Sequence, residues 1–461
     1  MDKIEEFLLK KGFSPSQINK ITNSYIVGTY KNYDILLSRI SNSIKWLEDN
    51  GYDEKSIIHM TTDIPAILSL DSKSFEDRIK FLKDNNFNEK EIKKMTKSCA
   101  HIFSYSIEDK LQPIIDYLKG LKFSESDIKK VLLRDPKLFT VSKDSLDEVF
   151  RNLHKLGFNK TQALAILKKA PSSFNSISTI PNKFKNVKDL EVQNSETQSI
   201  PLGFNKRQVV KMISDNPKIL TYGDSSLRKK ISNLYNLGFE LNAIKQMLIK
   251  SSPILCLSPN TVKKKFEHFE TMGYTKKQTV KVLQNMPTLF NLTSKRINSS
   301  FDNMQKYGFD RDTFKEMTVS HASLLNLTNK LMNSKLHALE KLGFSKEDVI
   351  NITSAAPTLL TSSIEMTRDK IEYLRSIGLG SIITKSPTNL ITSTATIYAR
   401  YEYFKSRKPP IQIDDEHYAN LFITWKNFEK KYGINKEDLL QQFNYDEFKQ
   451  KQKTEVNRNG R

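Results

Sequence analysis

A glycine–aromatic pair that recurs every 35 residues restricts the fold of this 461-residue chain more than any other feature. Its regular copies are Gly203-Phe204, Gly238-Phe239, Gly273-Tyr274, Gly308-Phe309, Gly343-Phe344 and Gly378-Leu379. Earlier copies are Gly12-Phe13, Gly51-Tyr52, Asn86-Phe87, Lys122-Phe123 and Gly157-Phe158, and the step to Phe204 is 46 residues. A proline follows the aromatic residue by 13 positions at Pro65, Pro136, Pro171, Pro217, Pro287 and Pro357, and by 14 at Pro253. Two markers coupled at one period indicate an array of one supersecondary unit, not an enzyme domain built around a single site.

The unit that begins at Phe123 predicts two helices joined by a proline turn. Ser124 and Asp127 form a near capping box, and apolar residues at helical spacing follow them. Pro136 cannot continue that helix, so it begins a short hydrophobic turn. A second amphipathic helix then ends at Gly157, which suits a helix end that needs positive φ. Each unit is therefore predicted to be helix, turn, helix, with the aromatic column packed in the core.

The predicted fold class is all-α: an α-solenoid of about ten such units, each of which contacts mainly its neighbours. The longer step after Phe158 contains a polar run, and Pro409-Pro410 interrupts the array near its end. The predicted segments are an N-terminal block of repeats at 1–175, an inserted loop at 176–201, a basic block of repeats at 202–408, a helical cap at 409–448 and a disordered tail at 449–461.

The chain is strongly basic, with 73 Lys and Arg against 52 Asp and Glu and a net charge of +21. Between Phe204 and Lys408 the counts are 32 basic and 16 acidic residues, so this block carries most of the excess. An excess of this size favours a polyanionic partner, either nucleic acid or an acidic membrane surface. Biased codon usage is the alternative interpretation of a chain rich in Lys and Asn.

Other classes of function find little support in the sequence. Cys99 and Cys256 share no metal-ligand spacing and fall where the unit buries small apolar side chains, which predicts free thiols in a reducing compartment. The seven histidines form no metal-binding pair, and Walker, dinucleotide-binding and nucleophile-elbow motifs are absent. No apolar run approaches the roughly 20 residues needed to span a bilayer. We therefore expect no enzyme activity, no cofactor, no metal and no membrane insertion.

The units resemble the repeat of the mitochondrial transcription termination factor (mTERF) family. The cleanest copy is Leu342-Gly343-Phe344-Ser345-Lys346-Glu347-Asp348 followed by Pro357-Thr358-Leu359-Leu360, and the resemblance covers roughly residues 8 to 400. Two units depart from it, because Ala100 and Ala322 replace the marker proline, but Ile102-Phe103 and Leu324-Leu325 keep the apolar pair of the turn. The resemblance implies a left-handed superhelix whose concave, basic face holds a nucleic-acid duplex.

The resemblance also implies a role in organellar transcription, ribosome assembly or intron splicing, and a mitochondrial or other organellar location. Residues 1–6 show neither a secretory apolar core nor an Arg-rich, acid-poor transit segment. A chain rich in Lys, Asn and Ile without such an address is also compatible with an effector that an intracellular microbe exports. Repeat proteins that read one DNA base per unit also begin with Gly-Phe-Ser, but they lack the phased proline.

The candidate nucleic-acid contacts lie early in the second helix, 21 to 26 residues after the aromatic residue. They are Arg228, Lys229, Lys230, Lys263, Lys264, Lys265, Lys295, Arg296, Lys330, Lys335, Arg368 and Lys370. Basic side chains at equivalent positions of five successive units would align along a phosphate backbone. Such contacts contribute affinity but no sequence specificity. A secondary row lies on the first helix, seven residues after the aromatic, at Lys94, Lys130, Lys211 and Lys281. The alternative interpretation of any single one of these residues is an ordinary surface charge that faces solvent and contacts no ligand.

The sequence thus predicts a monomeric protein that binds double-stranded DNA and acts in transcription termination or regulation. Structured RNA is the alternative ligand on the same fold, as in splicing or ribosome assembly. A third hypothesis, from another class of function, is an α-solenoid scaffold that binds an acidic protein.

Overall fold

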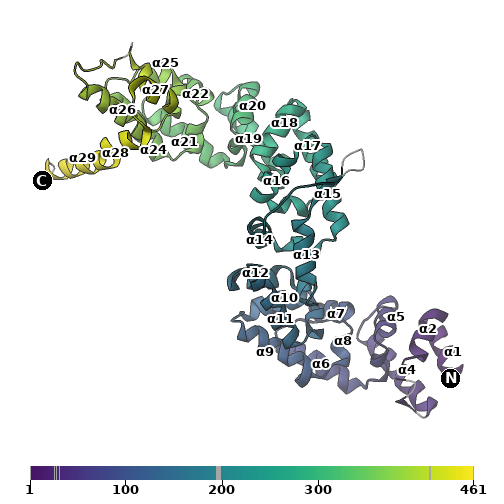
Figure 1. Cartoon of the computed structure of the whole chain (residues 1–461). Coiled ribbons are helices and arrows are strands. Elements are labelled where there is room, and N and C mark those ends of the chain that lie inside the picture. The colour runs from purple at the N-terminus through teal and green to yellow at the C-terminus, as the bar shows by residue number, and fades with distance from the viewer. Residues whose placement is uncertain are drawn as a thin grey trace. The chain divides into compact units, whose positions relative to one another are not determined.

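A computed structural model describes residues 2–24, 26, 29–30, 32–193, 199–414 and 417–459 of the chain. These residues are mostly helical, with one short β-hairpin, which confirms the all-α solenoid and its repeated helix–turn–helix unit (Figure 1). The chain divides into two compact units, Met1–Pro259 and Asn260–Arg461. This division does not coincide with the longer step at 176–201, where the sequence predicted a break between the two blocks of repeats.

The first helix of each repeat starts two residues after the aromatic position, or three after Leu379. These first helices are α2 (Pro15–Thr22), α5 (Glu54–Asp63), α7 (Glu89–Ser98), α10 (Glu125–Arg134), α12 (Lys160–Lys169), α14 (Lys206–Asp215), α16 (Leu241–Lys250), α18 (Lys276–Asn285), α20 (Arg311–Ser320), α22 (Lys346–Ala355) and the short α25 (Ile382–Lys385). Most begin at a Ser, Thr, Asn or Asp whose side chain accepts a hydrogen bond from a backbone N–H of the first turn, for example Ser345 from Asp348.

A short turn helix follows each first helix described above from α5 onward. The turn helices are η1 (Pro65–Ser69), α8 (His101–Ser104), η3 (Pro136–Thr140), η4 (Pro171–Phe174), η5 (Pro217–Thr221), η6 (Ser252–Cys256), η7 (Pro287–Asn291), η8 (Ala322–Asn326), α23 (Thr358–Thr361) and η9 (Pro387–Ile391). The prediction that the turn survives the loss of proline at Ala100 and Ala322 is confirmed. The turn helices α8 and η8 form at these positions, and each buries the apolar pair that follows its alanine.

The second helices complete the repeats. They are α1 (Asp2–Lys10), α4 (Tyr33–Asp49), α6 (Ser72–Asp84), η2 (Ile107–Leu111) continued by α9 (Gln112–Gly120), α11 (Lys143–Lys155), α13 (Thr179–Lys188), α15 (Asp224–Asn236), α17 (Pro259–Thr271), α19 (Ser294–Tyr307), α21 (Asn329–Lys341), α24 (Ile364–Ser376) and α26 (Thr394–Ser406). Within each compact unit, first helices contact first helices and second helices contact second helices, so the repeats build two parallel layers.

The end of each second helix explains the glycine–aromatic pair. In the repeat that ends at Phe158, the N–H of Phe158 donates to the carbonyl of Leu153 at 3.0 Å. The N–H of Gly157 donates to the carbonyl of His154 at 2.9 Å. This is a Schellman motif, which requires a left-handed residue, and Gly157 has φ 98°. In the two units without the glycine, Asn86 (φ 66°) and Lys122 (φ 64°) adopt the same conformation.

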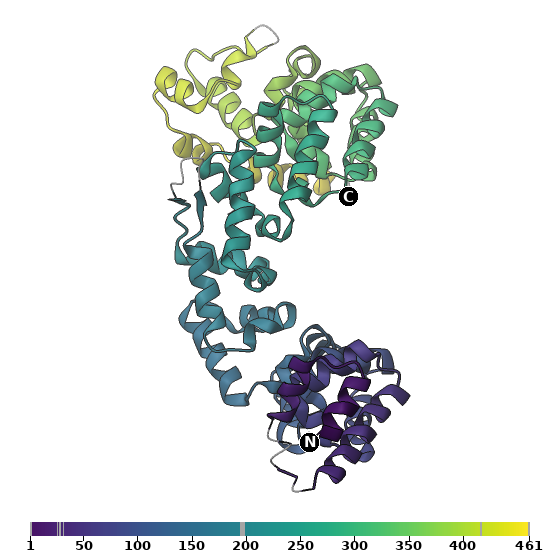
Figure 2. The same cartoon turned by 90° about the vertical axis from the view of Figure 1, so that its right-hand side faces the viewer.

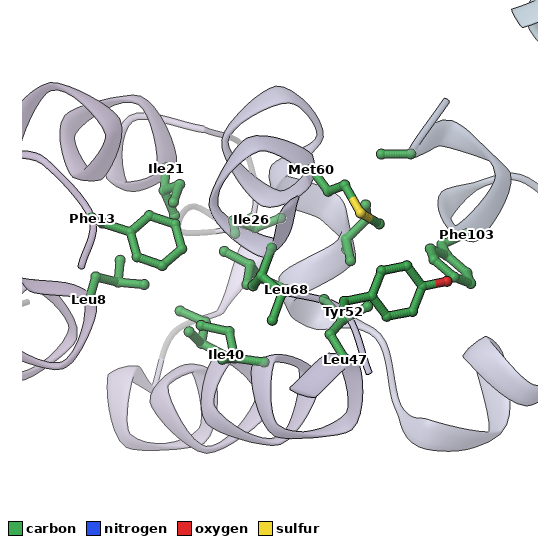
Figure 3. Packing of buried hydrophobic residues seen from close by; sticks show 14 of the residues in the cluster. Leu8, Phe13, Ile21, Ile26, Ile40, Leu47, Tyr52, Met60, Leu68 and Phe103 are labelled. Atoms are coloured by element: carbon green, nitrogen blue, oxygen red, sulfur yellow. The ribbon is translucent and has the colours of Figure 1, made fainter. Parts of the chain in front are cut away.

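The aromatic residue after the left-handed position packs between the helices of adjacent repeats, and every member of this column is buried. Figure 3 shows Phe13 between Leu8 and Ile21, and Tyr52 near Phe103 of the next repeat. A tyrosine in the column also finds a polar partner, since the Tyr52 hydroxyl lies 2.8 Å from the hydroxyl of Thr96. The aromatic column is therefore a set of core contacts between repeats.

Two segments differ from the predicted organisation. The expected loop at 176–201 contains α13, the second helix of its repeat, and a hairpin of β1 (Glu191–Gln193) and β2 (Ser199–Pro201), with Val192 paired to Ile200. The strand β1 packs beside α15 (Figure 2). Residues 194–198 of the predicted loop lie outside the described residues.

The C-terminal segment forms η10 (Tyr418–Leu421), α27 (Trp425–Tyr432), α28 (Lys436–Gln442) and α29 (Tyr445–Asn459). Arg400 of α26 links the last repeat to this cap, because its guanidinium lies 4.2 Å from the Trp425 ring centroid and donates to the carbonyl of Leu421 at 2.8 Å. The expected disordered tail at 449–461 lies mostly in α29, where Tyr445 donates to Asp369 at 2.9 Å; residues 460 and 461 are outside the described residues.

We expect Phe239→Ala to lower the free energy of unfolding by about 3–5 kcal/mol, because a fully buried aromatic side chain would leave a cavity between two repeats. Urea unfolding followed by circular dichroism measures the loss. Leu331→Ala is the control, since this side chain is 43% exposed and its truncation should change stability by less than about 0.5 kcal/mol. Equal effects of the two substitutions would contradict the proposed role of the aromatic column.

Candidate nucleic-acid interface

Five of the predicted cations form an exposed row on the second helices of the compact unit Asn260–Arg461. This exposed row consists of Lys263 and Lys264 on α17, Lys295 on α19, Lys330 on α21 and Arg368 on α24. Lys229 on α15 is also exposed, but it belongs to the other compact unit and is not counted in the row. Within the described part of the chain, only Lys263 of this row forms an ion pair, with Glu267 at 3.6 Å.

The members of the exposed row occupy one side of their helices. They lie 21, 24 or 25 residues after the aromatic residue of their repeat. Positions three or four residues apart share one side of an α-helix, so Lys295 and Lys330 at position 21 align with Lys263 and Arg368 at position 24. Because α19, α21 and α24 contact one another in order, the row continues from repeat to repeat.

Four other predicted cations point into the fold instead. Lys265 and Lys335 are 7% and 8% exposed, and their ammonium groups donate to the carbonyls of Leu292 and Ser362. Lys230 donates to the carbonyl of Leu255 at 2.6 Å, and Lys370 to that of Leu390 at 2.5 Å. All four lie 26 residues after the aromatic residue.

The partner carbonyls lie at the end of the next turn helix, where backbone acceptors lack helical partners. A cation is also favoured at such a C-terminal end. These lysines, defined here as the internal lysines, connect each second helix to the following repeat. Arg78, at the same position of an earlier repeat, donates to the carbonyl of Tyr105 at 3.2 Å in the same way. The internal lysines are therefore structural, and we leave them out of the interface.

Burial lowers the pKa of all four internal lysines, because the folded chain removes the ammonium groups from water. The effect is largest for Lys370, whose pKa falls to about 8 from the ordinary 10.5. Hydrogen bonds to carbonyls thus hold these side chains in place, although the ammonium groups lose part of their hydration.

The two predicted arginines next to the row also have partners within the fold. Arg228 pairs with Asp224 at 2.7 Å and with Glu191 of the hairpin. Arg296 donates to the carbonyl of Leu327 and to the side chain of Asn329 at 3.3 Å, both in the next repeat. The guanidinium groups therefore hold neighbouring elements together, which the spacing in the sequence did not reveal.

All four cations predicted on the first helices, Lys94, Lys130, Lys211 and Lys281, are exposed. Lys211 of α14 pairs with Asp215 of the same helix. Lys281 of α18 forms no ion pair within the described part of the chain. Lys281 lies on a first helix, in the layer opposite to the exposed row, and Lys211 belongs to the other compact unit.

Apolar side chains accompany the exposed row, and the charge-based reasoning missed them. Leu331 is 43% exposed beside Lys330, and Met366 is 67% exposed two residues before Arg368. Both lie 22 residues after the aromatic residue, a register that was visible in the sequence. They add an apolar component to a surface that would otherwise offer only charge.

Within the described residues, no group of three or more His, Cys, Asp or Glu side chains could hold a metal ion. None of the helices described is long and apolar enough to cross a membrane. Burial raises the pKa of the Cys99 thiol to about 11, so this cysteine is protonated at neutral pH.

The mTERF family model matches residues 5–273, 198–341, 268–378 and 332–408 of the chain. These overlapping matches cover the repeats from α2 to α26. No curated protein sequence matches the chain.

We expect the free energy of unfolding to rise with pH between about pH 8 and 9.5. Lys370 has a pKa of about 8 in the folded chain and an ordinary value of 10.5, so the unfolded chain binds more protons in this range. The rise should be at most about 1.4 kcal/mol per pH unit. Urea titrations of the wild type and of Lys370→Met across this range test it, and an unchanged slope in Lys370→Met would contradict this origin.

We expect Lys335→Ala to destabilise the fold by about 1–3 kcal/mol, because the Ser362 carbonyl would lose its buried donor. Lys330→Ala, five residues earlier on the same helix, removes an exposed charge and should change stability by less than about 0.5 kcal/mol. Thermal unfolding of both variants measures the difference. Equal melting temperatures would show that Lys335 is not an internal lysine in solution.

Proposed function

Since the chain belongs to the mTERF family, we propose that it binds double-stranded DNA along the exposed row and acts in transcription termination or regulation. Members of this family are helical-repeat proteins that bind nucleic acid and are generally not enzymes. The proposal includes a monomeric protein and an organellar site of action, as the family resemblance implies. It assigns no catalytic residue and no cofactor.

The observation that carries the proposal is the recurrence of exposed cations on successive second helices, of which only Lys263 forms an ion pair with a described residue. Packed helices lie about 8–10 Å apart, and phosphates of one strand recur about every 3.4 Å along a duplex. One repeat would therefore advance by roughly three nucleotides, so one cation per repeat can follow a phosphate backbone. Contacts of this kind position the duplex and carry no sequence information.

Lys281 and Lys211 lie on first helices, outside the exposed row, and Asp215 neutralises Lys211, so the proposed duplex site along the row does not include them. Leu331 and Met366 supply apolar contacts beside the cations. Such side chains favour contact with sugars or exposed base edges over contact with phosphates. Structured RNA carries the same phosphate chemistry, so it remains the second candidate ligand, and an acidic protein the third.

We expect Lys263→Glu/Lys264→Glu/Lys295→Glu, defined here as the row variant, to weaken binding of duplex DNA by at least about 30-fold. It removes three cations, each of which contributes about 0.9 to the slope of log affinity against log salt. The slope of the wild type should therefore fall by about three in the variant. Fluorescence anisotropy with labelled duplex DNA, a stem–loop RNA and a single strand at several salt concentrations measures affinity and slope together.

The matched control is Lys426→Glu/Lys430→Glu/Lys436→Glu, which reverses three exposed charges on the cap helices α27 and α28 of the same compact unit. It changes the net charge equally but leaves the exposed row intact. If the row variant and this control lose affinity to the same extent, binding follows net charge and the row is not the interface. Tighter binding of stem–loop RNA than of duplex DNA would replace the ligand in the proposal, and binding of neither would leave the protein-scaffold function.

A further inference from the structure

The first helices of the compact unit Met1–Pro259 carry a second set of exposed cations, separate from the exposed row. They lie 3, 7 or 11 residues after the aromatic residue on α7, α10, α12, α14 and α16. This outer stripe consists of Lys90, Lys94, Lys130, Arg134, Lys169, Arg207, Lys211 and Lys250, all of them exposed.

Helix geometry makes the outer stripe continuous. Residues four positions apart lie on one side of a helix and about 6 Å apart along it. The opposite side of the same helices enters the core, as Ile128 and Val131 of α10 do. Neighbouring first helices from α7 to α16 contact each other in order, at a typical interaxial distance of about 8–10 Å. The cations therefore extend across five helices of one compact unit.

The charge of the outer stripe is almost entirely positive and largely uncompensated. The only acidic residue at its positions on these five helices is Asp215, which pairs with Lys211. Arg134 donates to the backbone carbonyl of Lys168. The other six members form no ion pair with any described residue. An ordinary solvated helix surface mixes both signs of charge, so this surface is unusual for its composition.

The same positions on other first helices show that the stripe is not a general property of the repeat. On α18 of the second compact unit they still carry Lys277 and Lys281, whereas on α20 and α22 they carry Asp312, Glu316 and Glu347 and no basic residue. Within the first compact unit, the second helix α11 carries equal numbers of basic and acidic residues. Along the sequence, the basic residues at these positions therefore recur on the first helices from α7 to α18 and are replaced by acidic ones on α20 and α22.

Other lysines on the same first helices differ from the outer stripe, because they form hydrogen bonds to the preceding repeat. Lys129, one position before Lys130, donates to the carbonyl of Asn86 in the preceding repeat at 2.8 Å. Lys245 of α16 likewise donates to the carbonyl of Gly203 at 2.6 Å. Both lie six residues after the aromatic residue, and their acceptors are the left-handed residues that directly precede Phe87 and Phe204. Among the members of the outer stripe, only Arg134 donates to a backbone carbonyl of a described residue, that of Lys168 in α12.

We propose that the outer stripe is a second nucleic-acid-binding surface, which contacts phosphates independently of the exposed row. An array of unpaired cations across five helices matches the density of charge on a nucleic-acid backbone. An acidic membrane fits less well, because membrane-surface helices also present exposed apolar side chains. The large exposed hydrophobic side chains of the described part of this compact unit are Leu9, Tyr33, Ile35 and Ile177, and none lies on the five helices.

The test starts from the row variant, so that any remaining binding comes from elsewhere. One derivative adds Lys94→Glu/Lys130→Glu, two members of the outer stripe on neighbouring helices. The matched derivative adds Lys119→Glu/Lys143→Glu, which reverses two exposed charges on the second helices α9 and α11 of the same compact unit. Anisotropy with duplex DNA and stem–loop RNA at low salt measures binding, and circular dichroism confirms that each derivative is folded.

We expect the row variant to retain weak, salt-dependent binding that falls at least about fivefold with the stripe derivative and does not change with the matched derivative. The salt slope should fall by about two in the stripe derivative. The proposal is overturned if the two derivatives bind equally, or if the row variant has no remaining binding. Stripe-dependent binding of phosphatidylserine vesicles without binding of either nucleic acid would also overturn it.

The design keeps the two proposals distinguishable. If the row variant binds as tightly as the wild type, the exposed row fails as the interface, while the stripe derivative still reports on the outer stripe. If the stripe derivative behaves like its matched control in the row variant, the outer stripe fails while the exposed row stands.

Discussion

The architecture depends on how each second helix ends. A left-handed residue closes the helix by a Schellman motif, and the next residue, an aromatic, enters the core between two repeats. The backbone then reverses and the following helix begins within two or three residues. Because this single turn fixes both the chain direction and the inter-repeat contact, its repetition produces two parallel layers of helices. The conformation persists at Asn86 and Lys122, where a side chain makes the left-handed region less favourable than it is for glycine.

Basic residues serve two different purposes in this fold. Some bond within the fold: Lys265 and Lys335 donate to carbonyls at the ends of turn helices, and Lys129 and Lys245 donate to the carbonyls of the left-handed residues Asn86 and Gly203. Others remain in water on the exposed row and the outer stripe. The total positive charge therefore overstates the charge available to a ligand. A helical repeat has many carbonyls without partners at its helix ends, and long cationic side chains are well suited to reach them.

Much of the fold could be predicted from the sequence because the determinants are local. The proline, the N-terminal cap and the left-handed residue each mark a helix boundary through contacts within one helical turn. The helices of the structure begin and end at the positions that these residues predict. The inserted segment was harder to predict. Its helix α13 begins without a side-chain cap, and the sequences of β1 and β2 carry no strand signal. The helix α29 was missed because its sequence is polar, and it is held by contacts such as Tyr445 with Asp369, 76 residues apart.

The sequence by itself determined the repeat, its period, the buried aromatic column and membership in one family, because each follows from residue types at fixed spacing. Only the tertiary structure decided which cations are free. Lys264 and Lys265 are adjacent in the chain, yet one is exposed and the other is 7% exposed and bonded to Leu292. Neighbouring positions on a helix point about 100° apart, so one residue faces solvent while the next faces the following repeat. That difference depends on where the next repeat lies, which no local pattern encodes.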